Sequence, residues 1–270
     1  MFSRIVVGAD ASDSALRAVG RAVEFARRFD AEVLVLTVQD APGHSAAVDR
    51  LEAAVSGPVR AEVGDPAEVL VRVMETEPVD LLILGNRGMR GVSRFLGSIP
   101  NKVSHHLRAS LLLVDTTADR TFQPYETVVV GTDGSHSANR AVGAAATIAE
   151  RYGARLRVVN CYSGEGGRPG LDAGALLGAG YAGRGGGAAG SEAWEPLEAA
   201  RRALGDVDAV FEHRRGSPAE VLADLAAQQN SPLLVAGSRG MTGAARFLGS
   251  VPNKLTHTAR CDVLVFHTSP

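Results

Sequence analysis

The sequence predicts an α/β protein built from two repeated open five-stranded parallel sheets, each with helices on both faces. The first observation is a repeat: the 32 residues from Gly85 to Thr116 return 152 positions later as Gly237 to Thr268, with 17 identities. The second is that short, nearly continuous apolar runs alternate with segments of helical periodicity, which is typical of a parallel sheet covered on both faces. We therefore expect two domains, at residues 1–120 and 121–270.

In the first half, each expected element has a local reason. The strands are apolar runs bounded by turn residues, and they are expected at Arg4–Ala9, Glu32–Val38, Val59–Val63, Leu81–Leu84 and Ser110–Asp115. The helices carry apolar residues at helical spacing, and Pro66 occupies a first-turn position that suits proline. They are expected at about Ser12–Phe29, Ser45–Val55, Pro66–Glu75 and from about Ser98.

The second half repeats this order around an insertion. Residues 128–141 match 5–18 at an offset of 123, whereas 216–222 match 64–70 at an offset of 152. The 29 extra residues fall mainly at 163–190, where 12 of 28 residues are glycine. Such a stretch cannot offset its ordering entropy by burial, so we expect it to be mobile. It follows the second strand, at the carboxyl edge of the sheet, and a tolerated flexible insertion is favoured over a lid.

The repeated segment has the form of an anion site. In both copies a buried strand leads into a glycine-rich loop and then, at Ser98 or Ser250, into a helix start. The first helical turn has N–H groups without partners and a partial positive charge, and glycines let the main chain approach a phosphate closely. Either serine suits an N-cap hydroxyl or a hydroxyl donor to phosphate. The alternative, that these glycines are ordinary turn residues, stays open.

Two aspartates are expected at the same edge. Asp10 and Asp133 follow the first strand of each half, directly after Ala9 and Thr132. A carboxylate in this place can accept hydrogen bonds from a ribose or help to hold a metal beside phosphates. The alternative is a local role, in which the acid stabilises the dipole of the following helix.

The lysines are a further indication of an anion. The chain has 26 arginines but only two lysines, Lys102 and Lys254, at equivalent repeat positions in the first turns after Gly-Ser. A cation is disfavoured there by the helix dipole unless an anion is bound, and Arg87 and Arg239 lie nearby in sequence. The competing interpretation is a surface lysine paired with an acid.

Composition excludes several functional classes. The net charge is −2 with a pI near 6.4, and the halves are balanced, with 14 basic and 16 acidic residues up to Arg120 and 14 of each after it. Without a basic face we expect no nucleic acid partner. No apolar run approaches membrane-spanning length and the N-terminus lacks a signal pattern, so we expect a cytoplasmic protein without a membrane partner. Cys161 and Cys261 lie in apolar runs and are expected to be core thiols.

Each half resembles a universal stress protein domain of the UspA type, so the chain is similar to a tandem universal stress protein over nearly its full length. The resemblance rests on Asp-x-Ser after the first strand, on Gly-(Asp/Ser)-Pro-Ala-Glu, and on the Gly-x-x-Gly…Gly-Ser loop. It implies a Rossmann-like fold related to the adenine nucleotide α-hydrolases. For the ATP-binding branch of the family it also implies a stress-response or signalling protein that binds ATP, with Mg²⁺ accompanying the nucleotide.

By this resemblance, each half has a set of nucleotide-binding residues. The glycines and serines would wrap the phosphates and ribose, the residues after the first strand would lie by the nucleoside, and Val38 or Cys161 near the adenine. The set in the first half is Ala9, Asp10, Val38, Gly85, Arg87, Gly88, Gly97, Ser98 and Ile99. The set in the second half is Thr132, Asp133, Cys161, Gly237, Arg239, Gly240, Gly249, Ser250 and Val251.

One departure from the family pattern concerns loop length. Eight residues separate Gly88 from Gly97, and also Gly240 from Gly249, where the family pattern has nine. The missing residue either shortens the loop or shifts the register of its short helical turn, and either change alters the phosphate contacts. Because both halves share it, we expect both sites to keep or lose binding together, unless the glycine-rich insertion interferes with the second.

The resemblance also implies an assembly, in which Ser110–Asp115 and Cys261–His267 pair to form an internal pseudo-dimer and two chains can associate as a homodimer. Catalysis has little support: no Ser-His-Asp arrangement is readable, and His105 and His106 are neighbours whose side chains point about 100° apart on a helix. We expect slow ATP hydrolysis at most. The alternative function is a nucleotide-independent dimerising scaffold of the stress response.

Overall fold

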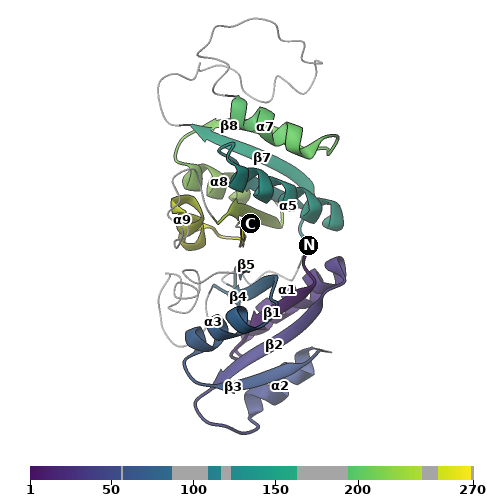
Figure 1. Ribbon diagram of the computed structural model, residues 1–270, viewed down its shortest axis with the longest axis vertical. Coiled ribbons are helices and arrows are strands. Elements are labelled where there is room, and N and C mark those ends of the chain that lie inside the picture. The colour runs from purple at the N-terminus through teal and green to yellow at the C-terminus, as the bar shows by residue number, and fades with distance from the viewer. Residues whose placement is uncertain (56, 87–108, 117–122, 163–193, 239–248, 269–270) are drawn as a thin grey trace, which may run out of the picture.

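One continuous sheet of ten strands runs through the part of the chain that the structure describes. The computed structural model describes residues 1–55, 57–86, 109–116, 123–162, 194–238 and 249–268. The strand order is β3-β2-β1-β4-β5-β10-β9-β6-β7-β8, with five strands from each half. In Figure 1 the strands β1 to β5 lie in the lower part of the molecule, and β7 and β8 lie in the upper part. Neighbours within a half are parallel, and β5 and β10 are antiparallel where the halves meet. The two predicted five-stranded sheets are therefore joined edge to edge.

The strands agree closely with the sequence prediction. In the first half they are β1 (Arg4–Gly8), β2 (Glu32–Gln39), β3 (Val59–Val63), β4 (Leu81–Gly85) and β5 (Ser110–Val114). In the second half they are β6 (Thr127–Gly131), β7 (Arg155–Tyr162), β8 (Val210–Arg215), β9 (Pro232–Gly237) and β10 (Asp262–Phe266). The prediction of a parallel α/β fold is confirmed, with strand ends within about one residue of those expected.

Helices cover both faces of the sheet. In chain order they are α1 (Asp13–Phe29), α2 (Ala46–Ala54), α3 (Pro66–Thr76), α5 (His136–Tyr152), α7 (Glu195–Leu204), α8 (Pro218–Ala227) and α9 (Ser250–Thr258). One buried apolar cluster joins the sheet to α1, α2, α5 and α7, and a second joins it to α3, α8 and α9. The helix expected from Ser98 and the glycine-rich insertion at 163–190 lie outside the described residues. None of the described helices has the length and apolar character needed to cross a membrane.

Local caps explain where several helices begin. The Ser12 hydroxyl accepts a hydrogen bond from the Ala15 N–H at 3.2 Å at the start of α1, and Ser135 does the same for α5. Asp65 accepts from two N–H groups of α3, whose first residue is Pro66. These side chains accept hydrogen bonds from N–H groups that a helix start otherwise leaves unpaired.

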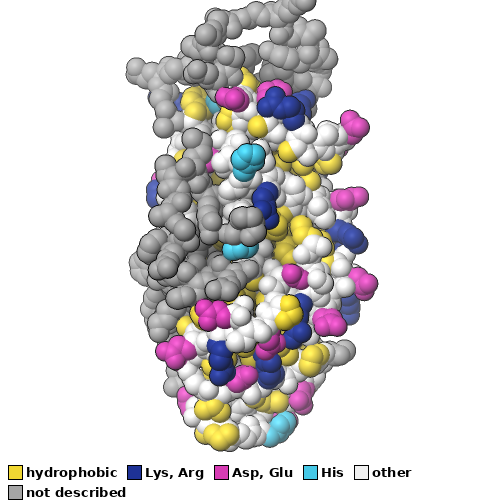
Figure 2. All heavy atoms as spheres, in the orientation of Figure 1, with side chains coloured by type: hydrophobic (Ala, Val, Ile, Leu, Met, Phe, Trp, Pro, Cys, Tyr) yellow, Lys and Arg dark blue, Asp and Glu magenta, His cyan; other side chains and the backbone are white. Residues whose placement is uncertain are grey.

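The surface mixes charges of both signs on the face shown in Figure 2.

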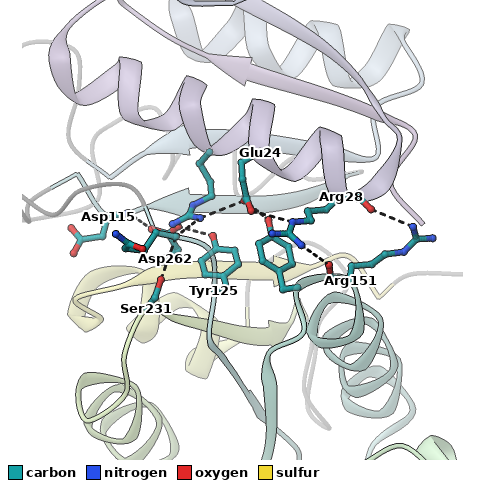
Figure 3. Close-up of polar contacts among 10 residues, drawn as sticks. Glu24, Arg28, Asp115, Tyr125, Arg151, Ser231 and Asp262 are labelled. Carbon is teal, nitrogen blue, oxygen red and sulfur yellow. Dashed lines mark hydrogen bonds and ion pairs between the residues drawn. The ribbon is translucent and has the colours of Figure 1, made fainter.

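The two halves are related by an approximate twofold arrangement across the β5–β10 seam. Leu111, Leu112 and Leu113 of β5 oppose Val265, Leu264 and Val263 of β10, and all six side chains are buried. Beside the seam, Arg28 Nη1 donates to the Arg151 carbonyl at 3.1 Å, and Arg151 Nη1 donates to the Arg28 carbonyl at 3.3 Å (Figure 3). These two arginines are equivalent in the repeat, so the contact is reciprocal.

A buried charged cluster breaks this symmetry. The Asp262 carboxylate accepts the Tyr125 hydroxyl at 2.6 Å and the Asp115 N–H at 2.8 Å (Figure 3), and it pairs with Arg21 Nε at 2.9 Å. The Arg21 guanidinium also lies 4.1 Å from the centre of the Tyr125 ring. Burial raises the pKa of Asp262, and the nearby Arg21 charge opposes that rise. The equivalent residues of the other half, Ser110 and Ala144, cannot form such a pair.

We predict that Arg21→Met destabilises the protein strongly. The substitution leaves the Asp262 carboxylate, whose side chain is 7% exposed, buried without its cation. Removing one partner of a buried ion pair costs about 3–5 kcal/mol, whereas losing an exposed pair costs about 0–1 kcal/mol. The measurement is urea denaturation of Arg21→Met, with Arg4→Met as the control because Arg4 pairs with Glu77 at a more exposed place. The double variant Arg21→Met/Asp262→Asn should recover most of the stability that Arg21→Met loses. Equal small losses of stability in Arg21→Met and Arg4→Met would contradict this account.

Candidate functional site

The described members of the predicted nucleotide sites gather at the carboxyl edge of each half sheet. In the first half, Ala9 and Asp10 follow β1, Val38 lies near the end of β2 and Gly85 ends β4. In the second half these places belong to Thr132, Asp133, Cys161 and Gly237, and the residues Gly249, Ser250 and Val251 begin α9. Parallel register brings these strand ends together. The remaining predicted site residues lie outside the described residues: Arg87, Gly88, Gly97, Ser98, Ile99, Arg239 and Gly240.

Ala9 and Thr132 anchor the loops that follow the first strand of each half. Both are buried. The Ala9 N–H donates to the Leu36 carbonyl at 3.0 Å, and the Thr132 N–H donates to the Val159 carbonyl at 2.8 Å. In the second half the Thr132 carbonyl also accepts from the Asn160 amide at 2.8 Å. These contacts hold each loop against the neighbouring strand.

The two aspartates shape the turns before α1 and α5. Asp10 Oδ1 accepts from the Ser12 N–H at 3.1 Å and from the Ser12 hydroxyl at 2.6 Å. Asp133 Oδ1 accepts from the Ser135 N–H at 3.0 Å, and the Asp133 side chain is exposed. Each acid therefore has a local role in the turn before its helix, whereas stabilisation of the helix dipole is not tested by these contacts. Contact with a ribose or a metal stays a prediction.

Val38 and Cys161 line the face of the sheet that packs against α3 and α8. Both are half-buried and border the second apolar cluster. Burial raises the pKa of Cys161 to about 11, so at neutral pH this residue presents an uncharged thiol. An apolar wall of this kind suits the flat face of a base rather than a charged group.

The N-terminus of α9 differs from those of the other described helices. Gly249 is the N-cap, no side chain of the described residues caps the helix, and the first helical turn holds no acidic residue. Every other helix that the structure describes has a side-chain cap or a first-turn acid. Among the described residues, the N–H groups of Ser250 and Val251 have no acceptor. Ser250 is thus the first helical residue, and the expectation of Ser250 as N-cap is wrong by one position.

Comparison with known proteins identifies the family. The family model described as "Universal stress protein family" matches residues 1–58, 46–115 and 124–267. The chain belongs to the universal stress protein family. Because the matches cover both halves, it is a tandem member.

Relatives and solved structures agree with this assignment. The universal stress protein Rv1636 of Mycobacterium tuberculosis is 37% identical over 149 residues, which are 54% of this chain and 98% of the relative. The universal stress protein MJ0531 of Methanocaldococcus jannaschii is 29% identical over 140 residues, covering 42% and 82% of the two chains. A universal stress protein of Archaeoglobus fulgidus aligns over 98% of both chains with a TM-score of 0.66 and 18% identity. A functionally unknown Pseudomonas aeruginosa protein, PA1789, aligns over 99% of this chain and 93% of its own, with a TM-score of 0.71 and 16% identity. At these identities the two structures show the fold alone.

The tandem universal stress protein also has polar contacts at the base of each glycine loop that the sequence analysis missed. In the second half the Thr268 hydroxyl lies 2.6 Å from Ser137 Oγ and 3.1 Å from Ser238 Oγ. In the first half Asn86 Oδ1 accepts from the Thr116 N–H at 3.0 Å and from its hydroxyl at 2.9 Å. The sequence signal was the identity of the two threonines, which directly follow the last-strand regions of the repeat. These contacts hold in place Asn86 and Ser238, the last described residues before each glycine loop.

Gly237 and Lys254 have defined surroundings in this universal stress protein. A Cβ on Gly237 would lie 3.2 Å from the Ser137 carbonyl oxygen, so a side chain at this position would require the neighbouring backbone to shift by a few tenths of an ångström. Lys254 Nζ lies 3.7 Å from Glu220 Oε1, and both side chains are well exposed. The interpretation of Lys254 as a surface residue paired with an acid is supported, and such a pair contributes little. Lys102 lies outside the described residues.

We predict that Gly134→Ala destabilises this universal stress protein by about 1–2 kcal/mol, because its φ of +79° disfavours a side chain. An added Cβ would also lie 3.0 Å from Pro196 Cα, at the start of α7. The matched control is Gly143→Ala in α5, where a Cβ meets nothing within 4 Å and alanine should stabilise by about 1 kcal/mol or less. Chemical denaturation measures both; a Gly134→Ala variant as stable as Gly143→Ala would show that the loop adopts another conformation.

Proposed function

We propose that this tandem universal stress protein binds ATP, or another adenine nucleotide, at the carboxyl edge of each half, and that occupancy of these sites is its signal in the stress response. The observation that carries the proposal is the N-terminus of α9, which no described side chain caps. Its uncapped N–H groups follow the glycine loop and face no first-turn acid. A phosphate at this place would satisfy those donors and interact favourably with the helix dipole.

The position of the site in the sheet supports the same ligand. In the first half β1 lies between β2 and β4, and in the second half β6 lies between β7 and β9, so the strand order reverses at β1 and β6. Open α/β sheets bind ligands at the carboxyl ends of the strands at such a switch point. Asp10 and Gly85 come from the two strands at this point in the first half, and Asp133 and Gly237 in the second.

The remaining residues fit the other parts of an adenine nucleotide. Val38 and the uncharged thiol of Cys161 offer an apolar wall for the base. The exposed Asp133 carboxylate can accept a hydrogen bond from a ribose hydroxyl. Carboxylate oxygens are also the ligands that Mg²⁺ takes beside phosphates, so Asp10 and Asp133 are the described residues that would assist a bound Mg²⁺. No catalytic role is proposed, because no described group at this edge stands out as a general base.

Isothermal titration with Mg-ATP tests the proposal. The wild-type chain should give a saturable binding heat, and Gly97→Ala/Gly249→Ala should abolish it because added side chains obstruct the close approach of phosphate. Gly143→Ala, which lies in α5, is the control and should bind as the wild type does, and circular dichroism of all variants should match.

Two outcomes would contradict the proposal. No heat at high micromolar Mg-ATP would favour a nucleotide-independent scaffold that acts through its surfaces. Undiminished binding by Gly97→Ala/Gly249→Ala would show that the glycine loops are not the phosphate sites.

A further inference from the structure

Three aromatic rings form a stack at the carboxyl edge of the second half. The ring centres of Tyr162 and His213 are 4.3 Å apart with planes 13° from parallel. The centres of His213 and Trp194 are 5.3 Å apart with planes at 28°. The rings come from three elements: the end of β7, the middle of β8 and the N-cap of α7. We call these three residues the aromatic platform.

The fold itself does not require the aromatic platform. In the first half the residues equivalent to Tyr162 and His213 are Gln39 and Ala61, and the N-cap of α2 is Ser45 where α7 has Trp194. The same strands and helix form there without an aromatic ring. Trp194 also makes no side-chain cap bond, so it does not serve the start of α7. The duplication thus provides an internal comparison in which only the second half has acquired the stack.

The aromatic platform lies on the opposite face of the sheet from Cys161. Side chains alternate along a strand, so Tyr162 and Asn160 face α7 whereas Cys161 faces α8. His213 is the register partner of Asn160, and Arg215 is the register partner of Tyr162, which places both on the α7 side. A ring bound on the platform would therefore be separate from a base that contacts Cys161.

The platform combines an accessible ring with unused polar groups. Trp194 is 42% exposed and is the largest of the exposed hydrophobic side chains that the structure describes. The Arg215 side chain is exposed and has no hydrogen bond or ion pair with any described residue. His213 Nδ1 is enclosed and likewise without a described hydrogen-bond partner. Indole rings stack on nucleobases, and guanidinium groups bind phosphate oxygens.

We propose that the aromatic platform, with Arg215, is a second nucleotide-binding site of this chain, which takes a free nucleoside monophosphate by stacking its base on Trp194 and pairing its phosphate with Arg215. The site is independent of the glycine loops and does not rest on nucleotide binding there. A single ring and a single cation match one base and one phosphate, so a mononucleotide fits better than a polymer.

Trp194 is the only tryptophan of the chain, so its fluorescence reports directly on the platform. We expect AMP to quench this fluorescence in a saturable way. Arg215→Ala should weaken the apparent affinity by about tenfold, because it removes the cation that pairs with the phosphate. His213→Ala should weaken it by a similar factor, because it removes the ring against which Trp194 is stacked. Arg214→Ala is the matched control, since Arg214 is occupied by Glu212 on the other face of β8, and it should leave the AMP affinity unchanged.

The glycine-loop variant Gly97→Ala/Gly249→Ala separates this site from the proposed ATP sites. Unchanged quenching by AMP in that variant supports the platform, whether or not Mg-ATP still gives a binding heat. Loss of quenching in that variant would show that AMP acts from the glycine loop and would overturn the proposal. The proposal also fails if AMP does not quench Trp194, or if a short single-stranded RNA quenches it while AMP does not.

Discussion

The antiparallel pairing of β5 with β10 is the constraint on which the arrangement of this protein depends. Each half is a complete parallel sheet whose last strand would be an exposed edge by itself. Joining the two last strands buries Leu111, Leu112 and Leu113 against their partners in β10. The edges at β5 and β10 are thereby paired, and among the described strands only β3 and β8 remain as edge strands. Because the pairing is antiparallel, all strands of one half run opposite to those of the other. The carboxyl ends of the strands, and the nucleotide sites proposed there, therefore lie at one strand-end edge of the sheet in the first half and at the opposite edge in the second half.

The seam also shows how the two copies have diverged under a shared geometry. Arg28 and Arg151 still make a reciprocal contact, as expected of equivalent residues around an approximate twofold. Asp262 instead has a buried network with Tyr125 and Arg21, where the other half has Ser110 and Ala144. Placing a carboxylate there requires both the cation and the hydroxyl, since burial alone would oppose its charge. The halves are thus alike in backbone and distinct in the polar groups that hold them together.

Much of the fold could be predicted because the information is local and repeated. Apolar runs set the strands, Ser12 and Ser135 set helix starts, and the duplication showed where the second half begins. Contacts between residues far apart in sequence could not be predicted in this way. The bonds of Asn86 to Thr116, the Arg21–Asp262 pair and the stack of Tyr162, Trp194 and His213 arise only once β-strands and helices are placed together. The strand-end residues of the predicted site lie together at one edge in each half. Ser250 is one residue past the N-cap of α9. Arg87 and Arg239 lie outside the residues that the structure describes.

The central claim is that each half of the sheet carries its own nucleotide site at its carboxyl edge. Native mass spectrometry of the gently purified chain, before and after addition of Mg-ATP, tests this most directly because it counts bound ligands. The account predicts species with one and two adenine nucleotides per chain, and two at saturation in the variant Arg215→Ala, which removes the aromatic platform as a contributor. A chain that keeps its ligand-free mass at saturating Mg-ATP would contradict it.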